Sequence, residues 1–197
     1  MLRMQFFPTV LMRYILTATI ILMLLVISGC QNLSTVDSQL DPSLDQIQQF
    51  LKKAKKSSGA QRADWLLLAS ESLLIKKRTD KALAVLNTVN SKELSVNAFQ
   101  LYHLLMAEAL SAADRTAQAL EQYHQIDQPE LLKKYQQIRF YRNYAELLNV
   151  LLRHYDSALQ RIALAEFLTD ELEIEENREL LWISLMQVSN LEVYRTS

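Results

Sequence analysis

The only cysteine of this 197-residue chain, Cys30, is the residue that the sequence singles out for chemistry. It directly follows Gly29, at the end of an apolar run. A single cysteine excludes an internal disulfide. The thiol is therefore either a small buried apolar group of a membrane anchor or a site of covalent modification. The residues that precede it distinguish these two readings.

The first thirty residues have the pattern of a secretory signal peptide. Arg3 and Arg13 precede the uncharged stretch 14–28, and no acidic residue occurs before Asp37. A basic start, a short apolar core and small residues at its end are typical of a cleaved leader. The uncharged stretch would reach about 22 Å as a helix, less than a hydrocarbon core of about 30 Å. An uncleaved anchor that begins near Val10 is the alternative.

The segment Ile27-Ser28-Gly29-Cys30 resembles the bacterial lipobox, in which a branched apolar residue and two small residues precede cysteine. The resemblance implies that the Cys30 thiol receives diacylglycerol and that a signal peptidase cleaves after Gly29. It also implies that the new amino group of Cys30 is acylated. Residues 1–29 would then be a lipoprotein signal peptide. No cofactor other than these covalent lipids is expected.

The mature product would begin at Cys30 and carry 19 basic and 22 acidic residues, because the leader holds two of the 21 basic residues and none of the acidic ones. Its formal charge of −3 means that lipid must hold it at a membrane. Gln31 follows the cysteine where inner-membrane lipoproteins often carry Asp, which favours the outer membrane, facing the periplasm. Residues 30–40 are expected to form a lipidated tether. Basic residues are not in excess, so the composition does not indicate nucleic-acid binding.

Composition predicts an all-α domain over residues 41–197. The chain holds only 2 Gly and 3 Pro, too few for the tight turns of an all-β domain, and half of its residues are apolar. The first helix is expected to start with Asp41 as N-cap and Pro42 at its first position. The segment Ser57-Ser58-Gly59 is expected to end it, with Gly59 as the C′ residue. About eight helices are predicted. The later ones are expected at 129–153, 156–169 and 169–189.

An internal sequence repeat, called the internal echo below, predicts that these helices pair as hairpins. Residues 65–89 match residues 102–126 at an offset of 37, with Glu71 matching Glu108. Both segments carry Arg-Thr at the expected turn, and the threonine is expected to cap the second helix. Residues 154–162 form a third copy of the repeat that matches less well. This pattern resembles tetratricopeptide repeats and predicts a TPR-like solenoid of helical hairpins with an inner binding surface.

Catalytic and metal-binding patterns are lacking in the sequence. The three histidines are far apart, and two glycines cannot build a phosphate-binding loop. No catalytic residue and no metal site is therefore predicted, and the protein is not expected to be an enzyme. The candidates for contacts on the inner surface are Tyr102, His103 and Tyr141. The alternative is that these side chains only pack within the helical stack.

Three segments together resemble the LppC family of outer-membrane lipoproteins, which activate a class A penicillin-binding protein. These segments are residues 64–89, "YQQIRFYRNYAELL" at 135–148 and "ENRELLWISLMQVS" at 176–189. Members of that family carry a second, larger domain after this one. The resemblance therefore implies only the N-terminal TPR-like domain, as part of a larger lipoprotein.

The resemblance implies a non-enzymatic regulator of peptidoglycan synthesis. Its expected partner is a class A penicillin-binding protein, with peptidoglycan as a second contact. A TPR-like scaffold lipoprotein for another envelope assembly machine is the alternative. An enzyme of peptidoglycan turnover is a third and weaker hypothesis, because a carboxylate pair across a cleft cannot be placed in the sequence.

Overall fold

The structure is a computed structural model that describes the backbone of residues 43–195 and the side chains up to residue 188. The chain divides into two units, Met1–Asp41 and Pro42–Ser197, and every described residue belongs to the second. The predicted signal peptide, the lipobox and the 30–40 tether therefore lie outside the described residues. Among the described helices, none has both the length and the apolar character needed to cross a membrane.

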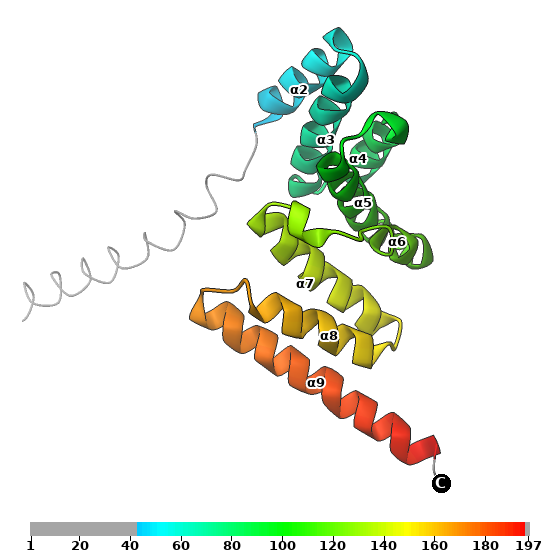
Figure 1. Cartoon of the computed structure of the whole chain (residues 1–197), viewed down its shortest axis with the longest axis vertical. Coiled ribbons are helices and arrows are strands. Elements are labelled where there is room, and N and C mark those ends of the chain that lie inside the picture. Colours follow the sequence, from blue (N-terminus) through cyan, green and yellow to red (C-terminus); the bar gives the residue numbers. More distant parts are fainter. Residues whose placement is uncertain (1–42, 196–197) are drawn as a thin grey trace, which may run out of the picture. The chain divides into compact units, whose positions relative to one another are not determined.

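The described part of the chain is all-helical, as the composition predicted (Figure 1). It contains eight α-helices and two short 3-10 segments, and no strand occurs within these residues. The α-helices are α2 (Leu44–Lys56), α3 (Gly59–Ile75), α4 (Thr79–Leu86), α5 (Val96–Ser111), α6 (Thr116–Tyr123), α7 (Lys134–Val150), α8 (His154–Ala165) and α9 (Glu171–Arg195).

Three helical hairpins make up most of this unit. The pairs α3–α4, α5–α6 and α7–α8 each pack side by side. The first helices of successive hairpins also touch, α3 against α5 and α5 against α7, while α2 packs on α3 and α9 packs on α8. One hairpin cannot bury both of its faces, so each neighbour completes the core of the one before. The predicted TPR-like arrangement is confirmed.

Small residues allow the two helices of each hairpin to approach closely. Ala82, Ala119 and Ala158 occupy equivalent positions in the second helices and are at most 2% exposed. The leucine that follows each alanine is half-buried in the first two hairpins, as Leu83 and Leu120, whereas Leu159 of the third is 45% exposed.

The ends of α2 differ from the prediction. The helix begins at Leu44, and the Ser43 hydroxyl accepts a hydrogen bond from the Gln46 N–H at 3.2 Å. A serine therefore caps the helix, and the predicted Asp41 cap lies outside the described residues. The helix ends at Lys56, directly before the segment 57–59 that was expected to end it. The prediction that Gly59 is its C′ residue is wrong, because Ser57 is the C-cap and both Ser57 and Ser58 are extended. Gly59 instead opens α3 with a φ of 56°, which glycine adopts without steric cost.

The hairpin turns share one backbone motif. A non-glycine residue in the left-handed region ends each first helix: Lys77, Asp114 and Leu152, with φ of 54°, 57° and 58°. The arginine that follows each of them donates its N–H to a leucine carbonyl five residues back, at 2.8–2.9 Å. This is the Schellman pattern of helix C-termini. The first two of these left-handed residues lie 37 positions apart, as in the internal echo, and the third follows 38 positions later.

The threonines of these turns are not caps. Arg78 and Arg115 occupy the N-cap positions of α4 and α6 and make no side-chain capping hydrogen bond. Thr79 and Thr116 are already the first helical residues. The predicted threonine caps are therefore wrong, because the left-handed residue brings the chain into the second helix one residue earlier than expected.

The third hairpin also begins later than predicted. Pro129–Leu131 forms a 3-10 turn, and α7 starts only at Lys134, where Gln136 Oε1 accepts the Lys133 N–H at 3.1 Å. Proline suits the first turn of either helix type, which explains the error. The bounds of the later helices also differ from the predicted ones. α7 ends at Val150 rather than Arg153, and α8 spans residues 154–165 rather than 156–169. α9 extends beyond the predicted end at residue 189.

Candidate functional site

A polar cluster joins the first helices of all three hairpins. Arg139 of α7 donates from Nη1 to Glu71 Oε1 of α3 at 2.7 Å and from Nε to Glu108 Oε1 of α5 at 3.0 Å. Its Nη2 makes a second contact with Glu108, so the guanidinium binds that carboxylate in a bidentate manner. Asn143, one turn after Arg139, donates to Glu108 Oε1 at 3.0 Å. One guanidinium thus connects three helices.

The Glu71 carboxylate has further partners on α7. The Tyr135 hydroxyl lies 3.3 Å from Glu71 Oε2, and the Gln136 amide nitrogen lies 3.3 Å from Glu71 Oε1. The side chains of Glu71 and Glu108 are only 8% and 9% exposed, whereas that of Arg139 is 24% exposed. Buried carboxylates need such partners, because an unpaired buried charge is strongly unfavourable.

Burial and pairing act in opposite directions on these charges. Burial raises the pKa of the Glu108 carboxyl above its ordinary value, while Arg139 and Asn143 oppose that rise. Desolvation by itself would lower the pKa of Arg139, but the carboxylates of Glu108 and Glu71 outweigh it and raise that pKa. The guanidinium therefore stays charged, and its charge stabilises the two buried carboxylates.

A cavity of about 480 Å³ opens beside this cluster. It is bounded by the C-terminal part of α3, the start of α4, the C-terminal part of α5 and the middle of α7. Its polar lining consists of Lys77, Thr79, Glu108, Arg139 and Asn143. Its apolar lining consists of Leu74, Ile75 and Ala112.

Two of the predicted inner-surface residues, Tyr102 and His103, lie together on α5. Their rings meet edge to face at 5.1 Å, and the Tyr102 side chain packs against the core between the first two hairpins. His103 is buried, and its Nδ1 lies 2.8 Å from Gln122 Oε1. Since an amide oxygen only accepts, Nδ1 carries the proton in this assignment. Burial lowers the pKa of His103.

The third predicted contact residue, Tyr141, lies on α7 in a different environment. Its ring stacks on Phe167 at 5.5 Å and meets Phe140 edge to face at 4.9 Å. Burial raises the pKa of the Tyr141 hydroxyl. The structure thus brings Tyr102 and His103 together and places Tyr141 in a separate aromatic group. A role of these residues in partner contacts stays a prediction.

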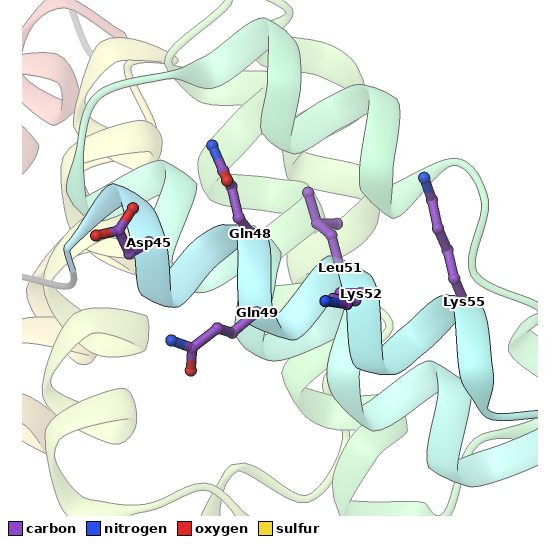
Figure 2. A pocket seen from close by; sticks show the side chains of 6 residues that line it. All are labelled: Asp45, Gln48, Gln49, Leu51, Lys52 and Lys55. Carbon is purple, nitrogen blue, oxygen red and sulfur yellow. The ribbon is translucent and has the colours of Figure 1, made fainter.

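A second cavity, of about 640 Å³, lies along α2 (Figure 2). Gln48, Leu51 and Lys55 point to one side of the helix in this view, and Gln49 points to the other. The lining comes from α2 alone, so the feature is a shallow groove rather than an enclosed site. The lysine-rich end of α2 also packs on the fold, because Lys53 Nζ lies 4.3 Å from the Trp65 ring centroid.

Within residues 43–188 the side chains form no group of three potential metal ligands. Each of two histidine rings pairs with a side-chain amide instead, His103 with Gln122 and His154 with Asn149. At the start of α9, Glu171 is exposed, whereas Glu173 is half-buried and accepts from Arg142 Nη2 at 3.0 Å. Asp170 caps that helix by accepting the Leu172 and Glu173 N–H groups at 3.0 and 3.1 Å.

Sequence reasoning missed Arg139 as the centre of the site. The match of Glu71 with Glu108 was the available signal, since two equivalent carboxylates on the first helices of neighbouring hairpins need a common cation once they are buried. The segment 135–148 contains two arginines, Arg139 and Arg142. The sequence does not assign either of them to the two glutamates, because the third hairpin departs from the 37-residue spacing.

Comparison with known proteins relates the chain to one family. The sequence model of the family described as "LppC putative lipoprotein" matches residues 39–197. The chain belongs to the LppC family. The resemblance stated from the sequence is therefore confirmed, and the match covers all the described helices of this LppC member.

The curated relatives of this LppC-family chain are much longer than the chain itself. The penicillin-binding protein activator LpoA from Vibrio cholerae serotype O1 is 25% identical over 177 residues. That alignment covers 88% of this chain and 29% of the relative. The chain thus spans less than a third of the length of the curated relatives it matches.

Solved structures of LpoA proteins share the fold of this LppC-family chain. The amino-terminal domain of Escherichia coli LpoA matches with a TM-score of 0.53 at 22% identity, covering 77% of this chain and 66% of that domain. Full-length LpoA from Haemophilus influenzae matches with a TM-score of 0.51 at 19% identity, covering 77% of this chain and 28% of that protein. At these identities the likeness concerns the fold alone.

Proposed function

We propose that this protein is an outer-membrane lipoprotein that activates a class A penicillin-binding protein by direct, non-enzymatic contact. The single observation that carries the proposal is the family match over residues 39–197, since the curated relatives that align with the chain are named as penicillin-binding protein activators. The proposed role is to raise the rate at which the partner synthase builds peptidoglycan.

The architecture supports a binding role. Stacked helical hairpins present an inner surface that is lined by their first helices, and such surfaces commonly bind other proteins. Here the first helices of three hairpins are fixed to one another by Arg139, so the surface is organised before any partner arrives. Preorganisation lowers the entropic cost of association.

Attachment to the outer membrane is part of this proposal. Lipidation of Cys30 would hold the domain at the periplasmic face through two or three acyl chains, each contributing about 0.8 kcal/mol per buried methylene. Residues 31–43 would span at most about 45 Å when fully extended. The helical unit would therefore work within that distance of the membrane and reach the synthase from there.

The test begins with the mature chain carrying Cys30→Ala, used as bait in detergent extracts of the membranes of the source bacterium. A class A penicillin-binding protein is expected among the specifically bound proteins. Purified synthase should then polymerise lipid II faster when the mature chain is added. Because the chain spans only part of its curated relatives, a full-length LpoA serves as the positive control.

Two outcomes would contradict the proposal. One is the absence of any cell-wall synthase among the bound proteins, with components of another envelope machine in its place, which would favour the scaffold alternative. The other is a purified synthase whose rate does not change although full-length LpoA accelerates it. Release of muropeptides from purified sacculi by the chain alone would instead indicate an enzyme of peptidoglycan turnover.

A further inference from the structure

We infer that the lysine-rich end of α2 docks on a membrane surface that contains anionic phospholipids, and that this contact orients the helical unit. The lysine cluster consists of Lys52, Lys53, Lys55 and Lys56. The inference rests on the proposed function only in taking this membrane to be the one that holds the Cys30 lipid.

The lysine cluster is exposed and largely unpaired. Its four members lie within five consecutive positions, and all four are exposed. None of the ion pairs among the described side chains involves Lys52, Lys55 or Lys56. Lys53 Nζ lies over the Trp65 ring, 4.3 Å from its centroid. Three charges of the cluster are therefore available to an anionic surface.

The helix dipole does not by itself account for the lysine cluster. Positive side chains are favourable in the last turn of a helix, and α2 carries Lys53, Lys55 and Lys56 there. However, each of the helices α3 to α8 ends without a basic residue in its last turn. This fold therefore forms stable helix ends without lysines, and α2 differs from its neighbours in carrying three of them.

Formal charge changes in sign along the helical unit. Residues 43–86, which hold α2, α3 and α4, contain nine basic and four acidic residues, a formal charge of +5. Residues 87–153 contain seven of each kind. Residues 154–188, which hold α8 and most of α9, contain two basic and eight acidic residues. An anionic surface therefore attracts the first helices of the unit and repels the last ones.

The acidic residues near the lysine cluster do not cancel its charge. Asp45 lies at the opposite end of α2, about 10 Å from Lys52 along the helix axis. Asp64 of α3 is balanced by Arg62 on the same helix. Two more aspartates precede α2, and with them residues 31–86 still carry a formal charge of +3. The part of the chain that follows Cys30 most closely is therefore positive.

The shallow groove along α2 provides donors for phosphate oxygens (Figure 2). Lys52 and Lys55 line it together with the side-chain amides of Gln48 and Gln49, which can also donate hydrogen bonds. Asp45 lines the end of the groove away from Lys55. A shallow groove on one exposed helix suits the headgroups of a broad surface better than an enclosed small molecule.

The proposed lipid anchor makes a weak contact sufficient. It is joined through the tether to the N-terminal end of α2, so the lysine cluster stays near the membrane at a high effective concentration. Each lysine close to an anionic surface strengthens binding about fivefold. Docking holds α2 at the membrane and keeps the acidic α9 away from it, where a partner in the periplasm can reach the later helices.

Vesicle flotation tests this contact on the mature chain carrying Cys30→Ala, which has no lipid of its own. Vesicles of phosphatidylethanolamine with about one third phosphatidylglycerol are expected to carry the chain at millimolar lipid and low salt. Vesicles in which phosphatidylcholine replaces the phosphatidylglycerol are expected to leave the chain behind. High salt is expected to release the bound chain, because it screens the attraction.

Two double variants locate the contact on the protein. Lys52→Gln with Lys55→Gln is expected to lower the partition coefficient at least about tenfold. Lys92→Gln with Lys134→Gln removes the same charge from exposed lysines outside the cluster and is expected to change the coefficient less than about twofold. Circular dichroism confirms that both double variants keep the helical fold.

The two tryptophans of the chain report its orientation on the vesicle. Trp65 lies beside Lys53, whereas Trp182 is exposed on α9. Phospholipids with a quencher on the headgroup are expected to quench Trp65 in a chain carrying Trp182→Phe. The same vesicles are expected to leave the emission of Trp182 unchanged in a chain carrying Trp65→Phe.

Three results would overturn the inference: no flotation with anionic vesicles, equal weakening by the two double variants, or quenching of Trp182 rather than Trp65. Purified sacculi provide the other arm. If they retain the chain through Lys52 and Lys55 while the vesicles do not, the ligand is cell-wall material and the inference is wrong. Neither a synthase nor an acylated chain enters these measurements, so their failure is distinct from a failure of the proposed function.

Discussion

Arg139 Nη1 and Glu71 Oε1 lie 2.7 Å apart although 68 residues separate them in the sequence. Their contact links the first helix of the first hairpin to the first helix of the third. The same guanidinium binds Glu108 of the helix between them. A charge network that holds three helices through a single residue makes the alignment of the hairpins sensitive to that residue.

Replacing Arg139 with alanine is expected to destabilise the fold by about 3 kcal/mol, because it leaves two buried carboxylates without their cation. Urea unfolding of the mature Cys30→Ala chain measures this loss. Arg178→Ala is the matched control, since Arg178 pairs with Glu175 on the exposed surface of α9. Exposed pairs of this kind contribute less than about 0.5 kcal/mol.

A double-mutant cycle isolates the interaction between Arg139 and Glu108 from their other contacts. Glu108→Gln keeps the shape of the side chain and removes its charge. If Arg139 stabilises the fold through Glu108, Arg139→Ala should cost less in the Glu108→Gln background than in the parent chain. Equal costs in both backgrounds would mean that the guanidinium does not act through that carboxylate.

The stability of the fold is expected to fall below pH 6.5 partly because of His103. Burial lowers the pKa of His103 in the folded state, so the unfolded chain binds the proton first as the pH falls. The contribution of the neutral ring is complete above the ordinary histidine pKa of about 6.5 and is lost as the pH falls below it. Urea midpoints at pH 7.5 and 5.5 should therefore differ more in the parent chain than in His103→Gln.

The exposed His124→Gln variant is the matched control for the loss of one imidazole. It should keep the parent's change in urea midpoint between pH 7.5 and pH 5.5. If His103→Gln and His124→Gln behave alike, burial of the His103 ring is not the cause of the pH dependence.

Lipidation of Cys30 predicts that radiolabelled palmitate joins the protein in growing bacteria. The mature mass should lack residues 1–29 and include the added acyl groups, and Cys30→Ala should abolish the label. Ser38→Ala, within the predicted tether, is the control and should be labelled like the parent. An unlabelled product that keeps the leading residues would contradict both the signal peptide and the lipid anchor.

The helical class and the hairpin pairing could be predicted because they depend on local properties. Scarcity of glycine and proline, helical spacing of apolar residues and the 37-residue echo all act within one or two helices. The echo even placed Glu71 and Glu108 at equivalent positions. Both carboxylates are indeed on first helices and share one partner.

The partner itself, Arg139, could not be predicted, because its contacts depend on how α7 is rotated against α3 and α5. The turns were misjudged for a related reason. Capping rules for side chains favoured Thr79 and Thr116 as N-caps, but the left-handed turn residue before each arginine starts the second helix one residue earlier, so Arg78 and Arg115 occupy the N-cap positions. Lys77, in the left-handed region, has no sequence signal, since glycine or asparagine would be expected there.

Substituting glycine for a turn residue in the left-handed region is expected to stabilise the fold. Leu152 has a φ of 58° and is 72% exposed, so its side chain strains the backbone without contributing to the core. Leu152→Gly should therefore raise the free energy of unfolding by about 1 kcal/mol, measured by urea denaturation. Val150→Gly, equally exposed but at the last helical position of α7, should instead lower it by about 0.5–1 kcal/mol. A loss of stability in Leu152→Gly would mean that the left-handed conformation does not strain this turn.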